Sequence, residues 1–378
     1  MKILLVGEYS RLHNSLKEGL TELGHQVTII ATGDHFKNYP VDIKLHRKYN
    51  NGVSKKIKVL IYKLLNIDIT SVSIKNQFFK HQEALKGFDI VQLINESPIG
   101  VTPKYEKEFI TFLKNKNKKI FLLSCGTDYI SVKHSFDKKP KYSILEPYFK
   151  GKASKKDFAP ILKYLKPEYK SLHEFVFNSI EGVIASDLDY HIPLEGHSKY
   201  LGLIANPINT ELLEFMPLKI TEKVIIFHGI NRANYYKKGS DYFEEALEII
   251  QNKYPNKLEI KTVESLPYEE YIKTYNEAHI VLDQVLAYDQ GYNALEAMAK
   301  GKVVFTGAEE EFNLHYQLEN KVAINALPNA QKIASSIEEL ILNPELIIEI
   351  GKNASEFIKK EHHYKKNAQK YLDTWKNN

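Results

Sequence analysis

Short apolar runs that alternate with helix-like segments constrain the fold of this chain most strongly. The first run, residues 2–7 (KILLVG), ends on glycine, and a helix is expected over 15–24, with Ser15 and Glu18 at capping-box spacing. Such continuous apolar runs are typical of strands that are buried on both faces of a parallel sheet. The series continues with strands expected at residues 26–32, 88–95, 119–125, 181–187 and 200–206.

The same alternation begins again after a segment with two prolines, residues 206–223. Strands are expected there at 223–229, 258–264, 279–285, 302–307 and 322–327, with a helix over 240–251. Two βαβ series joined by a linker predict an α/β protein of two doubly wound, Rossmann-like domains that face a central cleft. We place the domains at 1–206 and 207–378, with the C-terminal helix a candidate to cross back to the first domain. Residues 129–171, rich in tyrosine and lysine, are expected to cover the first sheet.

The composition is that of a folded globular protein in a reducing compartment. Hydrophobic residues make up 43% of the 378 residues and charged residues 26%. The single cysteine, Cys125, excludes an internal disulfide framework. We expect neither a secretory signal nor a spanning helix, because no window approaches about 18 continuous apolar residues. The chain is therefore expected to be cytoplasmic, with a peripheral position at the inner face of the cell membrane left open.

Positive charge is concentrated in residues 44–80. This segment has nine Lys or Arg and one acid, Asp68, so its formal charge is +8 within a chain of net charge +5. A basic segment that contains the apolar sequence KVLIYKLLNI suits a membrane surface or an anionic substrate. A solvated helical face is an equal alternative. Nucleic-acid binding is not expected, because no recognised module surrounds the segment.

The loop after the first strand of the second domain has the composition of a phosphate site. Gly229 permits a tight turn, Arg232 and Lys238 supply two positive charges, and Gly239 opens a helix. Arginine, lysine and a helix N-terminus together offer bidentate hydrogen bonds, a point charge and free backbone donors to a diphosphate. A merely basic surface loop is the alternative interpretation.

A second loop and helix, within YDQGYNALEAMAKG (residues 288–301), extend this site. Gly291 allows close approach of a ligand, and the helix that begins there directs its amides at an anion. Glu296 lies among apolar residues on the expected packed part of that helix, which is unusual for a carboxylate without a partner. Carboxylates commonly accept the hydroxyl pair of a ribose. The combination predicts a nucleotide site.

These residues resemble motifs of the GT-B glycosyltransferases, and in particular of the retaining family 4 group. Gly229, Arg232, Lys238 and Gly239 match the donor-diphosphate loop of that group, and Glu296 begins a match to the second half of its E-x7-E motif. Tyr288 stands where the first acid of that motif is expected, and Asp289 lies one residue late.

The likeness extends to the first domain through SCGTDYI (residues 124–130), which resembles a loop that faces the donor sugar. The resemblance implies catalytic roles for Arg232, Lys238 and Asp128. The donor-binding positions it implies are Gly229, Gly239, Asp289, Gly291, Tyr292 and Glu296.

The resemblance implies transfer of a sugar from a nucleotide-diphosphate donor to a polysaccharide or glycolipid acceptor, with retention of configuration. The acceptor would bind the first domain, where His13 is a candidate contact, with a position just ahead of a helix as the equal alternative. We expect no metal and no other cofactor. Asp187 and Asp189 have the D-x-D spacing of metal-dependent transferases but follow a strand of the first domain, away from the nucleotide loop. His228 is expected to be structural, and His362 and His363 to lie on the surface.

Three other functions use the same architecture. A nicotinamide dehydrogenase would use the same sheet, and Asp34 lies near the position expected for an acid that binds the ribose. The first turn, however, lacks the G-x-G-x-x-G fingerprint. A sugar-nucleotide epimerase would release an intact product without an acceptor. A catalytically degenerate nucleotide-sugar-binding subunit is suggested by the acid missing at position 288.

Overall fold

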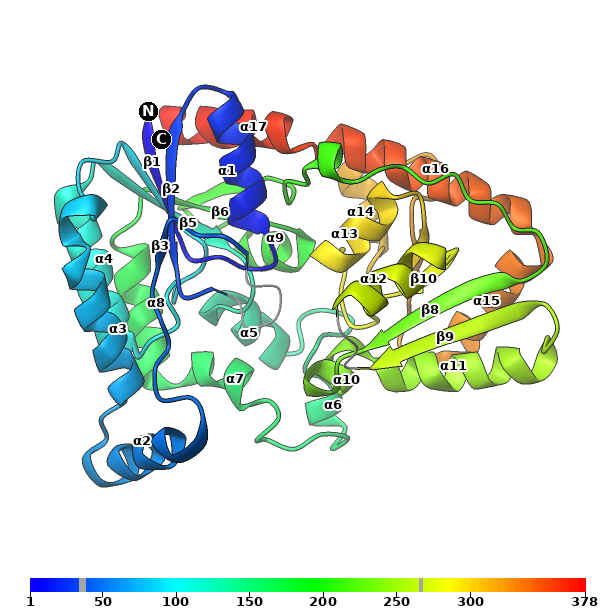
Figure 1. Cartoon of the computed structure of the whole chain (residues 1–378), viewed down its shortest axis with the longest axis horizontal. Coiled ribbons are helices and arrows are strands. Elements are labelled where there is room, and N and C mark those ends of the chain that lie inside the picture. The colour runs from blue at the N-terminus through cyan, green and yellow to red at the C-terminus, as the bar shows by residue number, and fades with distance from the viewer. Residues whose placement is uncertain (34–38, 265–267) are drawn as a thin grey trace. The chain divides into compact units, whose positions relative to one another are not determined.

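A computed structural model of the chain describes residues 1–33, 39–264 and 268–378 (Figure 1). The chain forms two compact units. The first consists of Met1–Val132, Ile161–Pro207 and Tyr364–Asn378, and the second of Lys133–Pro160 and Ile208–His363. Asp34, considered above as a ribose acid, lies outside the described residues.

Seven parallel strands form the sheet of the first unit, in the order β3-β2-β1-β4-β5-β6-β7. Their bounds are β1 Lys2–Val6, β2 Gln26–Ala31, β3 Ile43–Lys44, β4 Ile90–Leu93, β5 Lys119–Ser124, β6 Gly182–Ala185 and β7 Tyr200–Leu203. The central strand β4 is buried along its whole length, as expected for a parallel strand covered on both faces. Every strand predicted for this half of the chain is present, and among the strands of its described residues the two-residue β3 alone was not predicted.

Helices connect these strands. Their bounds are α1 Leu12–Glu22, α2 Gly52–Leu65, α3 Ile69–Lys80, α4 Pro103–Lys116, α5 Tyr129–Phe136, α7 Ala159–Leu162, α8 Pro167–Phe177, α9 Leu188–Leu194 and α17 Tyr364–Asn377, with short 3-10 helices at Gln82–Leu85 and Lys163–Leu165. The predicted capping box of the first helix is wrong. Helix α1 begins at Leu12, and the Ser15 amide already donates an intrahelical bond to the carbonyl of Arg11.

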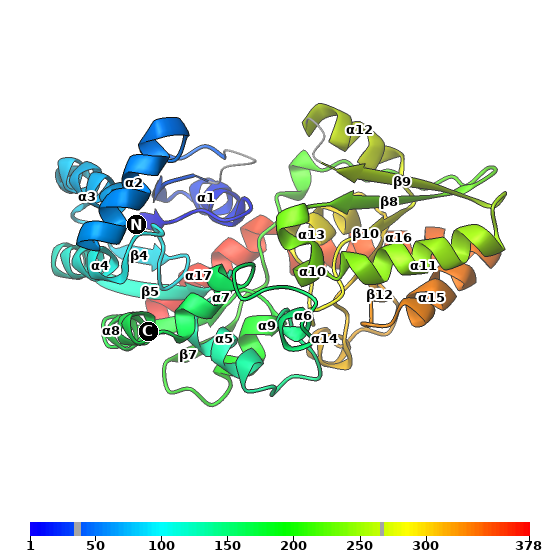
Figure 2. The same ribbon diagram turned by 90° about the horizontal axis from the view of Figure 1, so that it is seen from below.

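Within the described residues, five parallel strands form the sheet of the second unit, in the order β12-β11-β10-β8-β9. Their bounds are β8 Val224–Ile230, β9 Leu258–Glu264, β10 Ile280–Leu282, β11 Val303–Thr306 and β12 Ile324–Asn325. Figure 2 shows β8 and β9 side by side. The helices are α6 Glu146–Phe149, α10 Tyr235–Lys238, α11 Ser240–Lys253, α12 Tyr268–Glu277, α13 Tyr292–Ala299, α14 Glu310–Tyr316, α15 Ala330–Leu342 and α16 Pro344–Glu361, with 3-10 helices at Thr210–Leu212 and Arg232–Asn234. The prediction of two parallel α/β sheets is confirmed.

The C-terminal helix α17 packs against α1 in the first unit. A Cβ atom on Gly19 of α1 would lie 2.6 Å from the carbonyl oxygen of Tyr364, so the two helices approach closely because this position has no side chain. Trp375 is fully buried, and its indole nitrogen donates to Gln92 Oε1 of β4 at 3.0 Å. The last 15 residues therefore complete the core of the first unit rather than that of the second.

Residues 133–160 differ from the prediction that they cover the first sheet, because they belong to the second unit. The amide of Lys141 donates to the hydroxyl of Tyr288 at 2.7 Å. Lys141 also pairs with Glu309 at 3.1 Å, and Tyr142 donates its hydroxyl to the same carboxylate. These contacts are polar and come from residues far apart in sequence, so hydrophobic periodicity gave no sign of them.

Candidate functional site

Polar residues in the second unit lie at the point where the strand order of its sheet reverses. Strand β8 is followed in sequence by β9 on one side, whereas β10 is followed by β11 on the other. In doubly wound sheets, ligands bind beyond the carboxyl ends of the strands at such a switch point. Arg232 and Lys238 follow β8, and Asp283 follows β10, so the predicted phosphate loop lies at this position.

Lys238 forms an ion pair with Asp283. Its Nζ atom is 2.8 Å from Asp283 Oδ1, and the Asp283 carboxylate is almost completely buried. The amide of Val285 donates to the carbonyl of Lys238 at 2.9 Å, which fixes the end of α10 against the loop after β10. The positive charge of Lys238, which was predicted to bind a diphosphate, is therefore paired with the negative charge of Asp283 in this structure. Sequence analysis missed this partner, although Asp283 directly follows an apolar run.

Two glycines allow the close packing around this pair. Gly239 has φ +72°, and a Cβ atom there would lie 2.6 Å from the Cβ of Val285. Gly291 is the N-cap residue of α13, and a Cβ atom there would lie 4.0 Å from Asp283 Oδ2. Lys238 and the N-terminus of α13 thus approach the same carboxylate, and both favour negative charge.

Two further residues lie near this loop: Arg232 follows β8, and His228 is within the strand. Arg232 pairs with Glu264 at the end of β9, at 2.8 Å, and its side chain is 56% exposed. His228 is buried, and neither ring nitrogen hydrogen-bonds to a described residue. Burial, together with the charges of Lys238 and Arg232, lowers the pKa of His228 to about 4. The imidazole is therefore neutral near pH 7.

Glu296 is less buried than its sequence context predicted. Its neighbours Leu295 and Ala297 are fully buried, but Glu296 itself is partly exposed. Asn293 and Lys300 are partly exposed as well, and their spacing of three and four residues from Glu296 puts all three on one face of α13. Glu296 is thus a carboxylate at the helix surface, where a ligand can reach it without disturbing the core.

The loop before α13 is more tightly packed. Asp289 is buried and accepts the amide of Gln290 at 2.7 Å, and Tyr292 is buried in the first turn of the helix. A Cβ atom on Gly307 would lie 2.6 Å from the backbone of Asp289, so the two loops are nearly in contact. The hydroxyl of Tyr288 accepts the amide of Lys141, in the segment 133–160. Tyr288, which stands where the first acid of the E-x7-E motif is expected, therefore anchors this segment.

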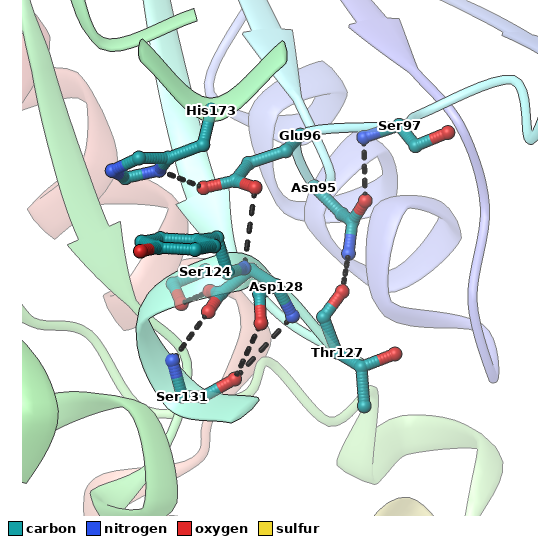
Figure 3. A network of polar contacts seen from close by, with 9 residues as sticks. Asn95, Glu96, Ser97, Ser124, Thr127, Asp128, Ser131 and His173 are labelled. Atoms are coloured by element: carbon teal, nitrogen blue, oxygen red, sulfur yellow. Dashed lines mark hydrogen bonds and ion pairs between the residues drawn. The ribbon is translucent and has the colours of Figure 1, made fainter. Parts of the chain in front are cut away.

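The first unit has its own polar network beyond the carboxyl ends of the neighbouring strands β4 and β5 (Figure 3). Asn95 follows β4, and its amide nitrogen donates to the carbonyl oxygens of Thr127 at 2.7 Å and Cys125 at 3.0 Å. Its side-chain oxygen accepts the amide of Ser97 at 2.7 Å. Asn95 therefore ties the loop after β4 to the loop after β5.

Glu96 is buried and pairs with His173, which is partly exposed. His173 Nδ1 lies 2.6 Å from Glu96 Oε1, and the other carboxylate oxygen accepts the amide of Tyr129 at 3.3 Å (Figure 3). Burial raises the pKa of Glu96, and the hydrogen bond from His173 opposes that shift. Neither residue was predicted from the sequence. The polar sequence directly after the strand over 88–95 was the available signal for Glu96, whereas His173 comes from the distant helix α8.

Asp128 holds the start of α5. Its Oδ1 accepts the amide of Ser131 at 2.7 Å, and its Oδ2 accepts the hydroxyl of Ser124. The carboxylate is buried, with both oxygens hydrogen-bonded inside the first unit. In this geometry Asp128 shapes the loop that the sequence nominated for the donor sugar.

His13 is fully buried in the first turn of α1, which argues against acceptor contact and differs from the predicted position just ahead of a helix. Its Nδ1 donates to the carbonyl of Gly7 at 2.7 Å, and burial lowers its pKa to about 4. Between these residues, Ser10 and Arg11 have φ of 51° and 78°. Left-handed backbone at residues other than glycine costs about 1–2 kcal/mol each, and such strain is concentrated at functional loops.

Other sequence candidates have structural partners. Asp187 caps α9, and its Oδ1 accepts the amide of Asp189 at 3.0 Å. His362 is buried against Phe357, so its predicted surface position is wrong. Within the described ranges, no group of three or more His, Cys, Asp or Glu side chains is arranged to hold a metal ion. No helix in the same ranges is both long and apolar enough to cross a bilayer.

Comparisons with known proteins support the same assignment of the fold. A family described as "Glycosyl transferase-like" matches residues 229–373, less than half of the chain. No curated protein sequence matches.

Three solved structures illustrate the likeness. Sucrose-phosphate synthase from Thermosynechococcus elongatus has a TM-score of 0.63 at 14% identity, over 100% of this chain and 98% of its own. HepE from Anabaena, solved with UDP-glucose, has a TM-score of 0.60 at 11% identity, over 100% of both chains. UDP-GlcNAc 2-epimerase from Neisseria meningitidis, bound to UDP-GlcNAc, has a TM-score of 0.54 at 14% identity, over 100% of both chains. The chain has the GT-B fold of glycosyltransferases, which these proteins share.

Proposed function

We propose that the protein is a glycosyltransferase that uses a nucleotide-diphosphate sugar. The observation that carries this proposal is the convergence of Lys238 and the N-terminus of α13 at the switch point of the second sheet, inside the segment that matches the glycosyltransferase family. A helix N-terminus and a lysine stabilise the negative charge that develops on a departing diphosphate. Arg232, Gly229 and Gly239 belong to the same donor site, and Glu296 would accept the ribose hydroxyls. Asp289, Gly291 and Tyr292 would contact the rest of the donor.

The first unit would bind the acceptor, through the polar network of Asn95, Glu96, Asp128 and His173. His173 Nε2 hydrogen-bonds to no described residue, and Nδ1 is held by Glu96. A histidine oriented through one nitrogen can exchange a proton with a hydroxyl at the other. The proposed acceptor is a saccharide or lipid-linked saccharide. Retention of configuration, independence of metal and a peripheral membrane position through residues 44–80 belong to the same proposal.

Transfer is tested by incubating the full chain with UDP-, GDP- and ADP-hexoses and a pool of saccharide and lipid-linked acceptors. Release of nucleoside diphosphate that requires an acceptor, with a new glycosidic bond detected by mass spectrometry, is the expected result. NMR of the product reports the configuration at the anomeric carbon. Activity that is lost in EDTA and restored by Mg²⁺ would contradict the metal-independent part of the proposal.

A sugar-nucleotide epimerase is the second candidate, favoured by the structural likeness to UDP-GlcNAc 2-epimerase. The buried carboxylates of the first unit could serve proton abstraction as well as acceptor binding. The two functions differ in their products. Conversion of the donor into an isomeric nucleotide sugar without any acceptor would identify an epimerase, whereas a nucleotide sugar that binds but never reacts would indicate a degenerate binding subunit.

A further inference from the structure

Helix α2 exposes an apolar surface that the fold does not use. No residue of α2 is buried against the described parts of the chain. Val53, Ile57, Leu60 and Leu64 have relative exposures of 72%, 49%, 57% and 72%. Their spacing of four, three and four residues places them on one side of the helix, and we call them the α2 stripe.

The helix is nevertheless held in place. Its half-buried residues are Ser54, Lys58 and Ile61, on a narrow face that contacts the rest of the first unit. Lys58 Nζ lies 3.4 Å from Asn50 Oδ1 and 3.9 Å from Asp68 Oδ1. Both views of the fold place α2 at the margin of the first unit, beside α3 (Figures 1 and 2). The α2 stripe is therefore a fixed surface feature of a helix about 21 Å long.

The positive charge of α2 indicates what kind of surface the helix binds. Its charged residues are four lysines, Lys55, Lys56, Lys58 and Lys63, and its sequence contains no acid. At 100° per residue, Lys56 and Lys63 fall along one edge of the α2 stripe. A second copy that packed stripe to stripe would bring lysines against lysines, which is unfavourable. An anionic lipid surface offers both the apolar phase for the stripe and the counter-charge for the lysines.

We propose that α2 docks the protein on an anionic membrane surface. The helix lies in the plane of the interface, with the α2 stripe in the acyl boundary and its lysines at the headgroups. Each lysine near such a surface contributes about fivefold in affinity. This inference rests on the peripheral membrane position included in the proposed function and names the element and the lipid charge responsible. Its test does not depend on transferase activity, because the residues involved lie outside both halves of the candidate site.

The test is vesicle flotation of the full chain. Vesicles of phosphatidylcholine alone are compared with vesicles that also contain phosphatidylglycerol, at low and high salt. The wild type should float with the anionic vesicles, and binding should fall by about tenfold or more without phosphatidylglycerol or in Leu60→Ser/Leu64→Ser. Leu314→Ser is the matched control, because Leu314 is 69% exposed in the second unit, and it should bind like the wild type.

Each alternative has its own result. Equal binding to both kinds of vesicle, or unchanged binding of the double variant, would overturn the proposal. Sedimentation analysis without lipid covers the remaining case, since a wild-type dimer that becomes a monomer in Leu60→Ser/Leu64→Ser would assign the α2 stripe to a second copy. Nucleotide binding, measured on the same samples, should be identical in all variants.

Discussion

Buried ionisable side chains at the residue scale set how this protein responds to pH and where its polar chemistry lies. His13 lies in helix α1 and His228 in strand β8, and burial lowers the pKa of each to about 4. Glu96 is also buried, but unlike these histidines it has a side-chain partner, because His173 supplies a hydrogen bond to its carboxylate. The histidines are therefore expected to affect stability, and Glu96 is expected to affect the proposed transfer reaction.

The pH dependence of stability tests the environment of His13. Its pKa falls from an ordinary value of 6.5 to about 4 in the fold, so the unfolded chain binds more protons between these values. Stability should therefore rise with pH from about 4 to 6.5 and be lost as the pH falls. At pH 5, His13→Gln should reduce this slope by about 1.2 kcal/mol per pH unit in urea unfolding. The exposed His81→Gln should leave the slope unchanged, and an equal effect of both changes would contradict the assignment.

Kinetics test Glu96 as a positioning residue. Glu96→Gln keeps the shape but weakens the hold on His173, so kcat/KM for the acceptor should fall by about a hundredfold. The donor KM should stay the same, because the proposed donor site is in the second unit. Glu106→Gln is the matched control, since Glu106 is also buried in the first unit but accepts hydrogen bonds from Ser97 and Val101. An equal loss of kcat/KM for the acceptor in both variants would mean that Glu96 has only a structural role.

Loops after parallel strands position the functional groups at the element scale. Strands β8 and β10 end side by side, and the loops that follow them bring Lys238 to Asp283. The positions of these strands along the chain could be inferred from apolar runs, because a strand covered on both faces is apolar along its length. The pairing of Lys238 with Asp283 could not, because it depends on which strands are neighbours. The same limit applies to His173, which reaches Glu96 from a helix 77 residues further along the chain.

The Lys238–Asp283 pair gives a prediction about donor affinity. A diphosphate bound to Lys238 would also meet the negative charge of Asp283, and like charges in contact are unfavourable. Asp283→Asn should therefore tighten nucleoside-diphosphate binding by about tenfold, or 1.4 kcal/mol, in calorimetric titration. Asp241→Asn removes a similar ion pair with Lys152 and should change little. Weaker binding in Asp283→Asn would mean that Asp283 positions Lys238 for the ligand instead.

At the scale of the whole molecule, the chain crosses more than once between its two units. Hydrophobic patterning predicted one passage between domains, near residue 206, whereas the chain also passes between the units at 132–133, 160–161 and 363–364, so residues 133–160 belong to the second unit. Their anchors, Lys141 and Tyr142, hydrogen-bond to Tyr288 and Glu309 in the other half of the sequence. Contacts of this kind arise from three-dimensional proximity and leave no local pattern.

The return of α17 to the first unit predicts the effect of a change at Gly19. A valine there would meet the backbone of Tyr364, because even a Cβ atom would lie 2.6 Å away. Overpacking of this kind costs about 1–3 kcal/mol, measured as the free energy of unfolding in urea. Thr21→Val places a branched apolar side chain at an exposed position of the same helix and should be nearly neutral. A stable Gly19→Val variant would argue against the close contact of α1 and α17.

Nucleotide binding at the switch point of the second sheet is the central claim, and calorimetric titration of the full chain with UDP, GDP, ADP and their hexoses tests it most directly. At least one of these ligands should bind the wild type. Lys238→Ala should weaken that binding by about tenfold or more, whereas the adjacent Lys237→Ala should not. Absence of binding by every ligand, or an equal effect of the two lysine changes, would contradict the account.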